Sequence, residues 1–140
     1  MKVLLLKSLM GWAVILCLAI VNGALREAIL IPSFGRMIGL ATSGVLLSLL
    51  VVLIAFGFVR LAPGVTVLQG IFVGFLWLCL TLVFEFTFGH YVQRKPLAEL
   101  LEAYAFTGGN IWPVVLVVTL LAPLFAALFH SKSKYAKSGA

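Results

Sequence analysis

The residues best suited to chemistry are ionisable and polar side chains set in otherwise apolar sequence. Glu85 lies near the end of the apolar run 65–89, and Asn22 and Arg26 lie one helical turn apart where the run 3–24 ends. A charge inside a membrane costs roughly 2.5 to 3.5 kcal/mol, so such groups usually face a bundle interior and often mark a binding site or an ion pathway. These three residues are the first candidates for a polar site.

Arg26 is the expected counter-charge of Glu85, because both lie at the same end of their apolar runs. A neighbouring guanidinium would keep the Glu85 carboxylate ionised. We therefore expect an outward-facing cavity that receives a polar or anionic group, with six candidate solute- or ion-binding residues: Glu85, Arg26, Asn22, His90, Arg36 and Asn110. The alternative is a structural ion pair and hydrogen-bond network that fixes how the first and third spans pack.

The spacing of the other reactive residues indicates neither a metal site nor an enzyme. No histidines or glutamates recur at metal-ligand spacing, and the two cysteines stand alone in different apolar runs. The chain also lacks the residues that would bind haem or retinal, so we expect no cofactor. A membrane-embedded enzyme ranks third among the function classes, since the chain offers one buried carboxylate and a nearby histidine without a nucleophile pair or a phosphate loop.

The composition requires a membrane. The chain has 140 residues, of which 64% are hydrophobic and 10% charged, and its mean hydropathy is +1.23. Soluble domains are roughly half apolar and about a quarter charged, and so small a globule cannot bury this much apolar surface in water. A soluble enzyme, a nucleic-acid-binding module and a secreted disulfide scaffold are excluded, and the net charge of +6 comes from basic residues beside apolar runs.

Four apolar runs are long enough to cross about 30 Å of hydrocarbon, which takes about 20 residues of helix. They predict an all-α fold, an integral membrane bundle of four transmembrane helices, in one domain over residues 1–130 with spans at about 3–24, 37–59, 65–89 and 111–130. We expect the first run to be retained rather than cleaved as a signal peptide, because Lys7 interrupts its start and Asn22 is unsuitable at a cleavage site.

An even number of spans puts both termini on the same side of the membrane. Six basic residues flank the spans on that side: Lys2, Lys7, Arg60, Lys132, Lys134 and Lys137. Four flank them on the other side: Arg26, Arg36, Arg94 and Lys95. By the positive-inside rule, we expect both termini in the cytoplasm, with a basic tail over residues 131–140.

The two connections on the opposite side are expected to be structured. Residues 25–36 are too apolar for a free loop, so they should lie in the interface or fold back over the bundle. After Pro96, leucines and a tyrosine recur at helical spacing until a pair of glycines follows. This pattern predicts a short amphipathic outer helix that caps the bundle, with Glu99 and Glu102 on its polar face.

Small residues four positions apart predict where the helices pack. Gly70 and Gly74 form one such pair, and Gly39 and Ser43 form another. These pairs allow two helix backbones to approach closely. They bear on packing and not on the identity of a substrate.

Three stretches, NGALRE at 22–27, FEFTFGHY at 84–91 and GNIWP at 109–113, resemble those of small uncharacterised four-span inner-membrane proteins of bacteria. The resemblance covers nearly the whole chain. It implies a multi-pass protein of a bacterial inner membrane and carries no established activity.

Two functions from different classes fit these residues. The first is a small transporter or channel in which Glu85 and Arg26 bind or gate a polar solute, an ion or a proton. Four spans are few for a carrier acting alone, so this function implies a homo-oligomer. The second is a non-catalytic accessory or lipid-binding subunit of a second membrane protein. Membrane lipids are expected partners in both cases, and nucleic acid in neither.

Overall fold

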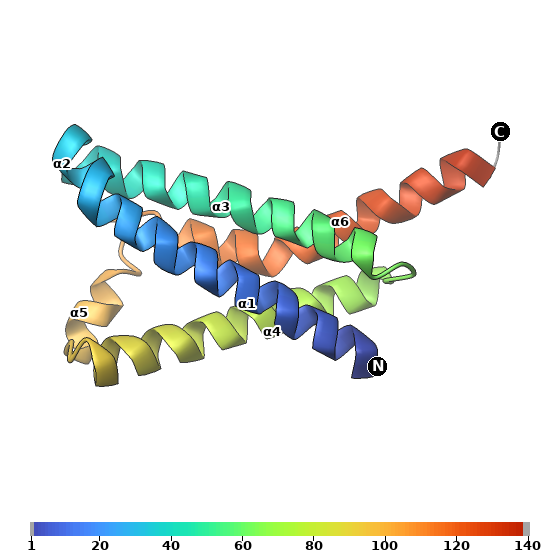
Figure 1. Ribbon diagram of the computed structural model, residues 1–140, viewed down its shortest axis with the longest axis horizontal. Coiled ribbons are helices and arrows are strands. Elements are labelled where there is room, and N and C mark those ends of the chain that lie inside the picture. The colour runs from blue at the N-terminus through green and yellow to red at the C-terminus, as the bar shows by residue number, and fades with distance from the viewer. Residues whose placement is uncertain (1, 139–140) are drawn as a thin grey trace.

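The computed structural model describes residues 2–138, with side chains described for residues 2–132. Every regular element in that part of the chain is a helix, and four helical segments are long and apolar enough to cross a membrane: Lys2–Phe34, Arg36–Leu61, Val67–Val92 and Trp112–Lys132. Their main helices form a bundle (Figure 1): α1 (Lys2–Leu25), α3 (Arg36–Leu61), α4 (Val67–Thr87) and α6 (Trp112–Ser138). The predicted all-α bundle is confirmed.

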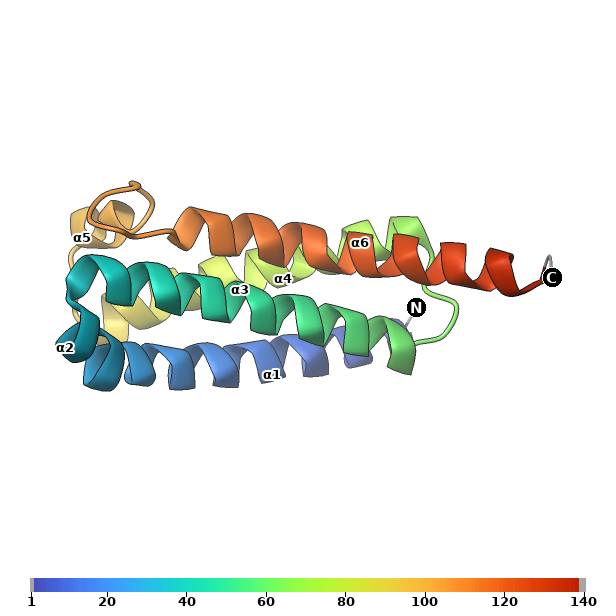
Figure 2. The same ribbon diagram turned by 90° about the horizontal axis from the view of Figure 1, so that it is seen from above.

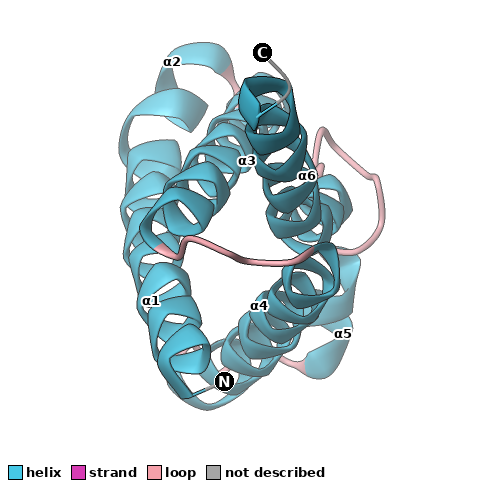
Figure 3. Cartoon of the chain, turned by 90° about the vertical axis from the view of Figure 1, so that its right-hand side faces the viewer, coloured by secondary structure: helices cyan, strands magenta, loops and turns pink. Residues whose placement is uncertain are grey.

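The two ends of the bundle differ. Both chain ends and the turn between α3 and α4 lie at one end, which we call the termini end (Figures 1 and 2). The short helices α2 (Ile31–Phe34) and α5 (Leu97–Glu102) lie at the other, which we call the cap end. Around the bundle axis the long helices follow one another in the order α1, α3, α6 and α4 (Figure 3).

Tryptophan side chains join α1 to α4 in the half of α1 nearer the termini end. The Trp77 indole N–H donates to the carbonyl and hydroxyl oxygens of Ser8, at 2.9 and 3.1 Å. The Trp12 indole N–H donates to Oγ1 of Thr81 at 3.2 Å. Beyond these bonds the two helices diverge toward the cap end (Figure 1).

The closest helix packing lies between α4 and α6. A Cβ atom added at Gly70 would lie 2.9 Å from the carbonyl oxygen of Pro123, and one at Gly74 would collide with the carbonyl oxygen of Leu120. Only residues without a side chain allow this approach. The prediction that Gly70 and Gly74 form a contact face is confirmed, and α6 is the helix that fills it.

The connection after α1 is helical, so the first helical segment runs ten residues beyond its predicted end, to Phe34. Pro32 supplies no N–H to the α-helical ladder, and the chain passes through a π-helical turn, η1 (Arg26–Leu30), before α2. Gly35 then turns the chain with φ 81°. α2 packs against the start of α3, because a Cβ at Gly39 would lie 2.9 Å from the backbone nitrogen of Ile31.

The predicted outer helix is present but shorter than the pattern indicated. α4 ends in a second π-helical turn, η2 (Phe88–Val92), and α5 has six residues. Leu100 is its buried residue and packs on Gly89, whereas Leu97 and Leu101 are more than half exposed. The chain then turns through two glycines with positive φ before α6 begins.

At the termini end, polar side chains satisfy helix ends. Thr66 and Gln69 form a capping box at the start of α4, and Lys7 donates to the carbonyl oxygen of Leu61 at the end of α3, at 2.7 Å. α6 continues as helix to Ser138, past residue 131 where the predicted tail begins. Residues 139–140, and the tail's side chains from residue 133 onward, lie outside the described residues.

Candidate polar site at Glu85

Glu85 lies in the last turn of α4 and is held by two neutral hydrogen-bond donors. The Tyr104 hydroxyl lies 2.7 Å from Oε2 of Glu85, and the Trp112 indole Nε1 lies 2.9 Å from the same oxygen. We call these three residues the Glu85 cluster. All three side chains are half-buried. The other carboxylate oxygen, Oε1, accepts no hydrogen bond within the described part of the chain.

Asn110 shapes the loop that brings Trp112 to Glu85. Its Nδ2 donates to the carbonyl oxygen of Ala103 at 3.0 Å, and its Oδ1 accepts from the backbone N–H of Trp112 at 3.0 Å. One amide side chain therefore fixes both ends of the turn between α5 and α6. Asn110, predicted as a binding residue, instead positions a residue of the cluster.

Tyr104 is held as a hydrogen-bond donor. Burial, its hydrogen bond to Glu85 and the charge of that carboxylate raise the pKa of Tyr104 above its ordinary value. The phenol thus stays protonated at physiological pH. The ring of Phe86 stacks on that of Tyr104 with centroids 5.9 Å apart, which holds the ring in place.

Arg26 is not the partner of Glu85, so this predicted pair is wrong. Its Nε lies 3.0 Å from Oε1 of Glu27, the next residue, and both side chains are at least one-third exposed. The physical reason is the divergence of α1 from α4 at the cap end (Figure 1). Tyr104 and Trp112 occupy the donor positions that Arg26 was expected to fill.

Asn22 belongs to a different contact. It is buried, and its Nδ2 donates to the carbonyl oxygen and to Oγ of Ser43, at 3.2 and 2.8 Å. The prediction that Ser43 lies in a helix contact is confirmed, and the contact joins α3 to α1. Oδ1 of Asn22 is buried with no partner among the described residues.

The last two predicted site residues lie on the surface of the cap end. His90 is exposed in η2, where its Nδ1 lies 3.2 Å from the carbonyl oxygen of Lys95. Arg36 is exposed in the first turn of α3. The six predicted residues are thus dispersed: Glu85 and Asn110 belong to one network, Asn22 to a helix contact, and Arg26, His90 and Arg36 to the surface.

Sequence reasoning missed Tyr104 and Trp112 as partners of Glu85. Tyr104 is the tyrosine at helical spacing after Pro96, and Trp112 belongs to the stretch GNIWP at 109–113. A usable signal was present, because a phenol O–H and an indole N–H are donors that need an acceptor when they are buried.

The described residues contain no group of three histidine, cysteine or carboxylate side chains that could hold a metal ion.

Comparison of the chain with protein-family models, with curated proteins and with solved structures gives no match in any of the three. The resemblance to bacterial inner-membrane proteins therefore stays a prediction. Function has to be argued from the site itself.

Proposed function

We propose that this protein is a small oligomeric transporter or channel that binds a proton or a cation at Glu85. The observation that carries this proposal is the set of partners around the Glu85 carboxylate. Two neutral donors hold Oε2, and among the described residues no arginine or lysine neutralises the group and no donor reaches Oε1. An ionisable group of this kind in a membrane span is a functional-site candidate by default.

The depth of Glu85 supports this proposal. The apolar segment ends at Val92, which puts Glu85 roughly 10 Å from that end at about 1.5 Å per residue. A proton or small cation reaching Glu85 from the cap end therefore crosses only part of the hydrocarbon. Tyr104 and Trp112 meet the carboxylate through the O–H and N–H groups at their ring edges, and Phe86 stacks on Tyr104, so the carboxylate itself is the group that would balance an organic cation.

A second copy of the chain is part of this proposal. Within one chain, the small-residue face of α4 is already filled by α6. At the cap end, α1 and α4 diverge (Figure 1). We propose that a homo-oligomer completes the pathway there, because four spans are few for a carrier acting alone.

We also propose that both termini face the cytoplasm of a bacterial inner membrane. In the sequence, six lysines and arginines flank the spans at the termini end and four flank them at the cap end. This distribution agrees with the positive-inside rule. Protease or thiol-reagent accessibility of a C-terminal tag in intact spheroplasts tests it, and labelling of that tag from outside would contradict it.

The test of transport is flux through liposomes that contain the purified protein. Wild type should pass protons, measured with an internal pH-sensitive dye, or tetramethylammonium, measured with radiolabel. Glu85→Gln should abolish the flux, because the amide cannot exchange a proton or balance a cation. Glu99→Gln is the matched control, since Glu99 is exposed and paired with Lys95 at 3.4 Å. Equal flux in wild type and Glu85→Gln would reject the proposal.

The competing function is a non-catalytic accessory subunit. One observation favours this function: both donors to Glu85 come from the segment after α4. The carboxylate therefore also attaches that segment, residues 97–112, which we call the cap, to the bundle. The cap exposes Leu97, Leu101 and Phe106, each more than half accessible, to a partner. Wild-type liposomes without flux, together with a membrane protein that copurifies until these residues are changed, would support this alternative.

A further inference from the structure

An apolar groove runs between α3 and α6 on the outside of the bundle. Its wider part is a cavity of about 250 Å³ lined by Val52 and Phe56 from α3 and by Val118, Leu121 and Phe125 from α6. Phe56 and Phe125, which line the groove, remain partly exposed. A groove of this kind in a membrane span faces hydrocarbon chains.

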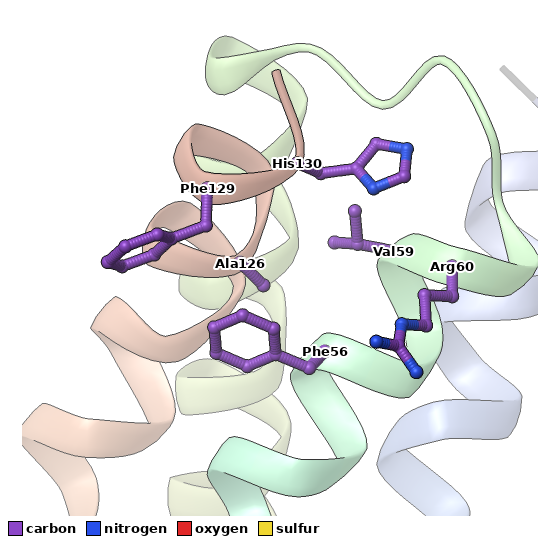
Figure 4. Close-up of a pocket in the computed structure, with 6 residues that line it drawn as sticks. All are labelled: Phe56, Val59, Arg60, Ala126, Phe129 and His130. Atoms are coloured by element: carbon purple, nitrogen blue, oxygen red, sulfur yellow. The ribbon is translucent and has the colours of Figure 1, made fainter. Parts of the chain in front are cut away.

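The groove continues into a polar pocket at the termini end. This second cavity, of about 160 Å³, shares Phe56 and Phe129 with the first and adds Arg60 and His130. Figure 4 shows the guanidinium of Arg60 and the imidazole of His130 at this pocket, one from α3 and the other from α6. From Val118 to His130 the groove extends roughly 18 Å along α6, which exceeds the roughly 15 Å depth of one leaflet.

Arg60 has no acidic partner among the residues that the structure describes. All four acidic side chains, Glu27, Glu85, Glu99 and Glu102, belong to elements of the cap end. Two of these carboxylates form ion pairs with described residues: Glu27 with Arg26, and Glu99 with Lys95. Arg60 makes no ion pair with a described residue, and residues 133–140 contain no acidic side chain in sequence. The exposed guanidinium of Arg60 is therefore open to an anion from outside the chain.

We infer that this groove binds an anionic phospholipid, with one acyl chain along Phe56, Leu121 and Phe125 and the phosphate at Arg60 and His130. The apolar groove lies toward the membrane centre, and the cationic pocket lies at the membrane surface. This is the order of the acyl chain and the headgroup in a phospholipid. Basic residues at a membrane surface attract anionic headgroups. The inference concerns the end of the bundle opposite Glu85 and does not rest on the proposed function.

Native mass spectrometry of the full chain in detergent tests this lipid site. The probes are phosphatidylglycerol and phosphatidylcholine with identical acyl chains, so that only the headgroup charge differs. Wild type should retain phosphatidylglycerol in preference to phosphatidylcholine. Arg60→Gln should lower retention of phosphatidylglycerol about fivefold and leave phosphatidylcholine unchanged, as expected for the loss of one headgroup charge contact.

Arg36→Gln is the matched control, because Arg36 is also an exposed arginine of α3 but lies at the cap end. It should leave the preference unchanged. Phe125→Ala should lower retention of both lipids, since it removes an acyl-chain contact. Equal phosphatidylglycerol retention in wild type and Arg60→Gln, or an equal loss in Arg36→Gln, would overturn the inference. Displacement of phosphatidylglycerol by inorganic phosphate would overturn it too, because the pocket would then recognise the anion without the lipid.

Discussion

The hydroxyl of Tyr104 donates to Oε2 of Glu85 at 2.7 Å, across 19 residues of sequence. This bond joins the end of α4 to the turn that follows α5. Trp112, at the start of α6, donates to the same oxygen. One carboxylate oxygen thus fixes the cap end of the bundle, while the other accepts no hydrogen bond from a described residue.

Replacing Tyr104 by phenylalanine should destabilise the protein. The change removes a hydrogen bond to a carboxylate, which is worth about 1.5 to 3 kcal/mol, while the ring stacked on Phe86 is kept. Thermal unfolding in detergent, followed by circular dichroism, measures the loss. Tyr91→Phe is the control, because Tyr91 is exposed and makes no described hydrogen bond. Equal losses in the two variants would contradict the role of Tyr104.

The raised pKa of Tyr104 predicts a loss of stability at alkaline pH. The unfolded phenol titrates at about pH 10, and the folded phenol titrates above that value. The stabilisation is therefore complete below about pH 10 and is lost as the pH rises toward the folded pKa, because the unfolded state releases its proton first. Unfolding free energies of wild type and Tyr104→Phe should converge above about pH 10. A constant difference between them over this range would contradict the assignment.

Gly74→Ala should be strongly destabilising. Its Cβ would collide with the carbonyl oxygen of Leu120, and such overpacking typically costs about 1 to 3 kcal/mol. Gly57→Ala, in α3, is the matched control, since a Cβ there meets no atom within 4 Å. This control should be neutral or slightly stabilising, because alanine favours helix over glycine. Thermal unfolding of both variants measures the difference in their stability. Equal melting temperatures would mean that α4 and α6 are farther apart than described.

Changes at Arg26 and Glu85 should be energetically independent. The two side chains have different partners, Glu27 for Arg26 and the cluster donors for Glu85. The effects of Arg26→Gln and Glu85→Gln on the free energy of unfolding should therefore add within about 0.5 kcal/mol in the double variant. A coupling energy above about 1 kcal/mol would restore the ion pair that the sequence predicted.

The sequence predicts the spans and the helix contacts well. Apolar runs alone give the four helices, because spanning hydrocarbon requires about 20 apolar residues. The Gly70 and Gly74 pair was found for the same kind of reason, since close approach needs small residues at fixed spacing. These signals are local, and each depends on residues within one helix.

The residues that contact Glu85 could not be predicted from such local patterns. The predicted partner of Glu85 was chosen by charge and by depth, which place Arg26 at the correct end of the bundle. Which groups meet there depends on the divergence of α1 from α4 and on the fold of the loop from Ala103 to Trp112. Neither leaves a periodic pattern in the sequence, so the neutral donors Tyr104 and Trp112 emerged only from the structure.

The proposed transport requires that the Glu85 carboxylate exchange a proton or a cation. Infrared difference spectroscopy of the protein in liposomes, titrated from mildly acid to mildly alkaline pH with and without tetramethylammonium, tests it most directly. We predict a carboxyl band that titrates or shifts with the cation in wild type, persists in Glu99→Gln and is absent in Glu85→Gln. Identical difference spectra for wild type and Glu85→Gln would show that the carboxylate only fastens the cap, which would contradict the account.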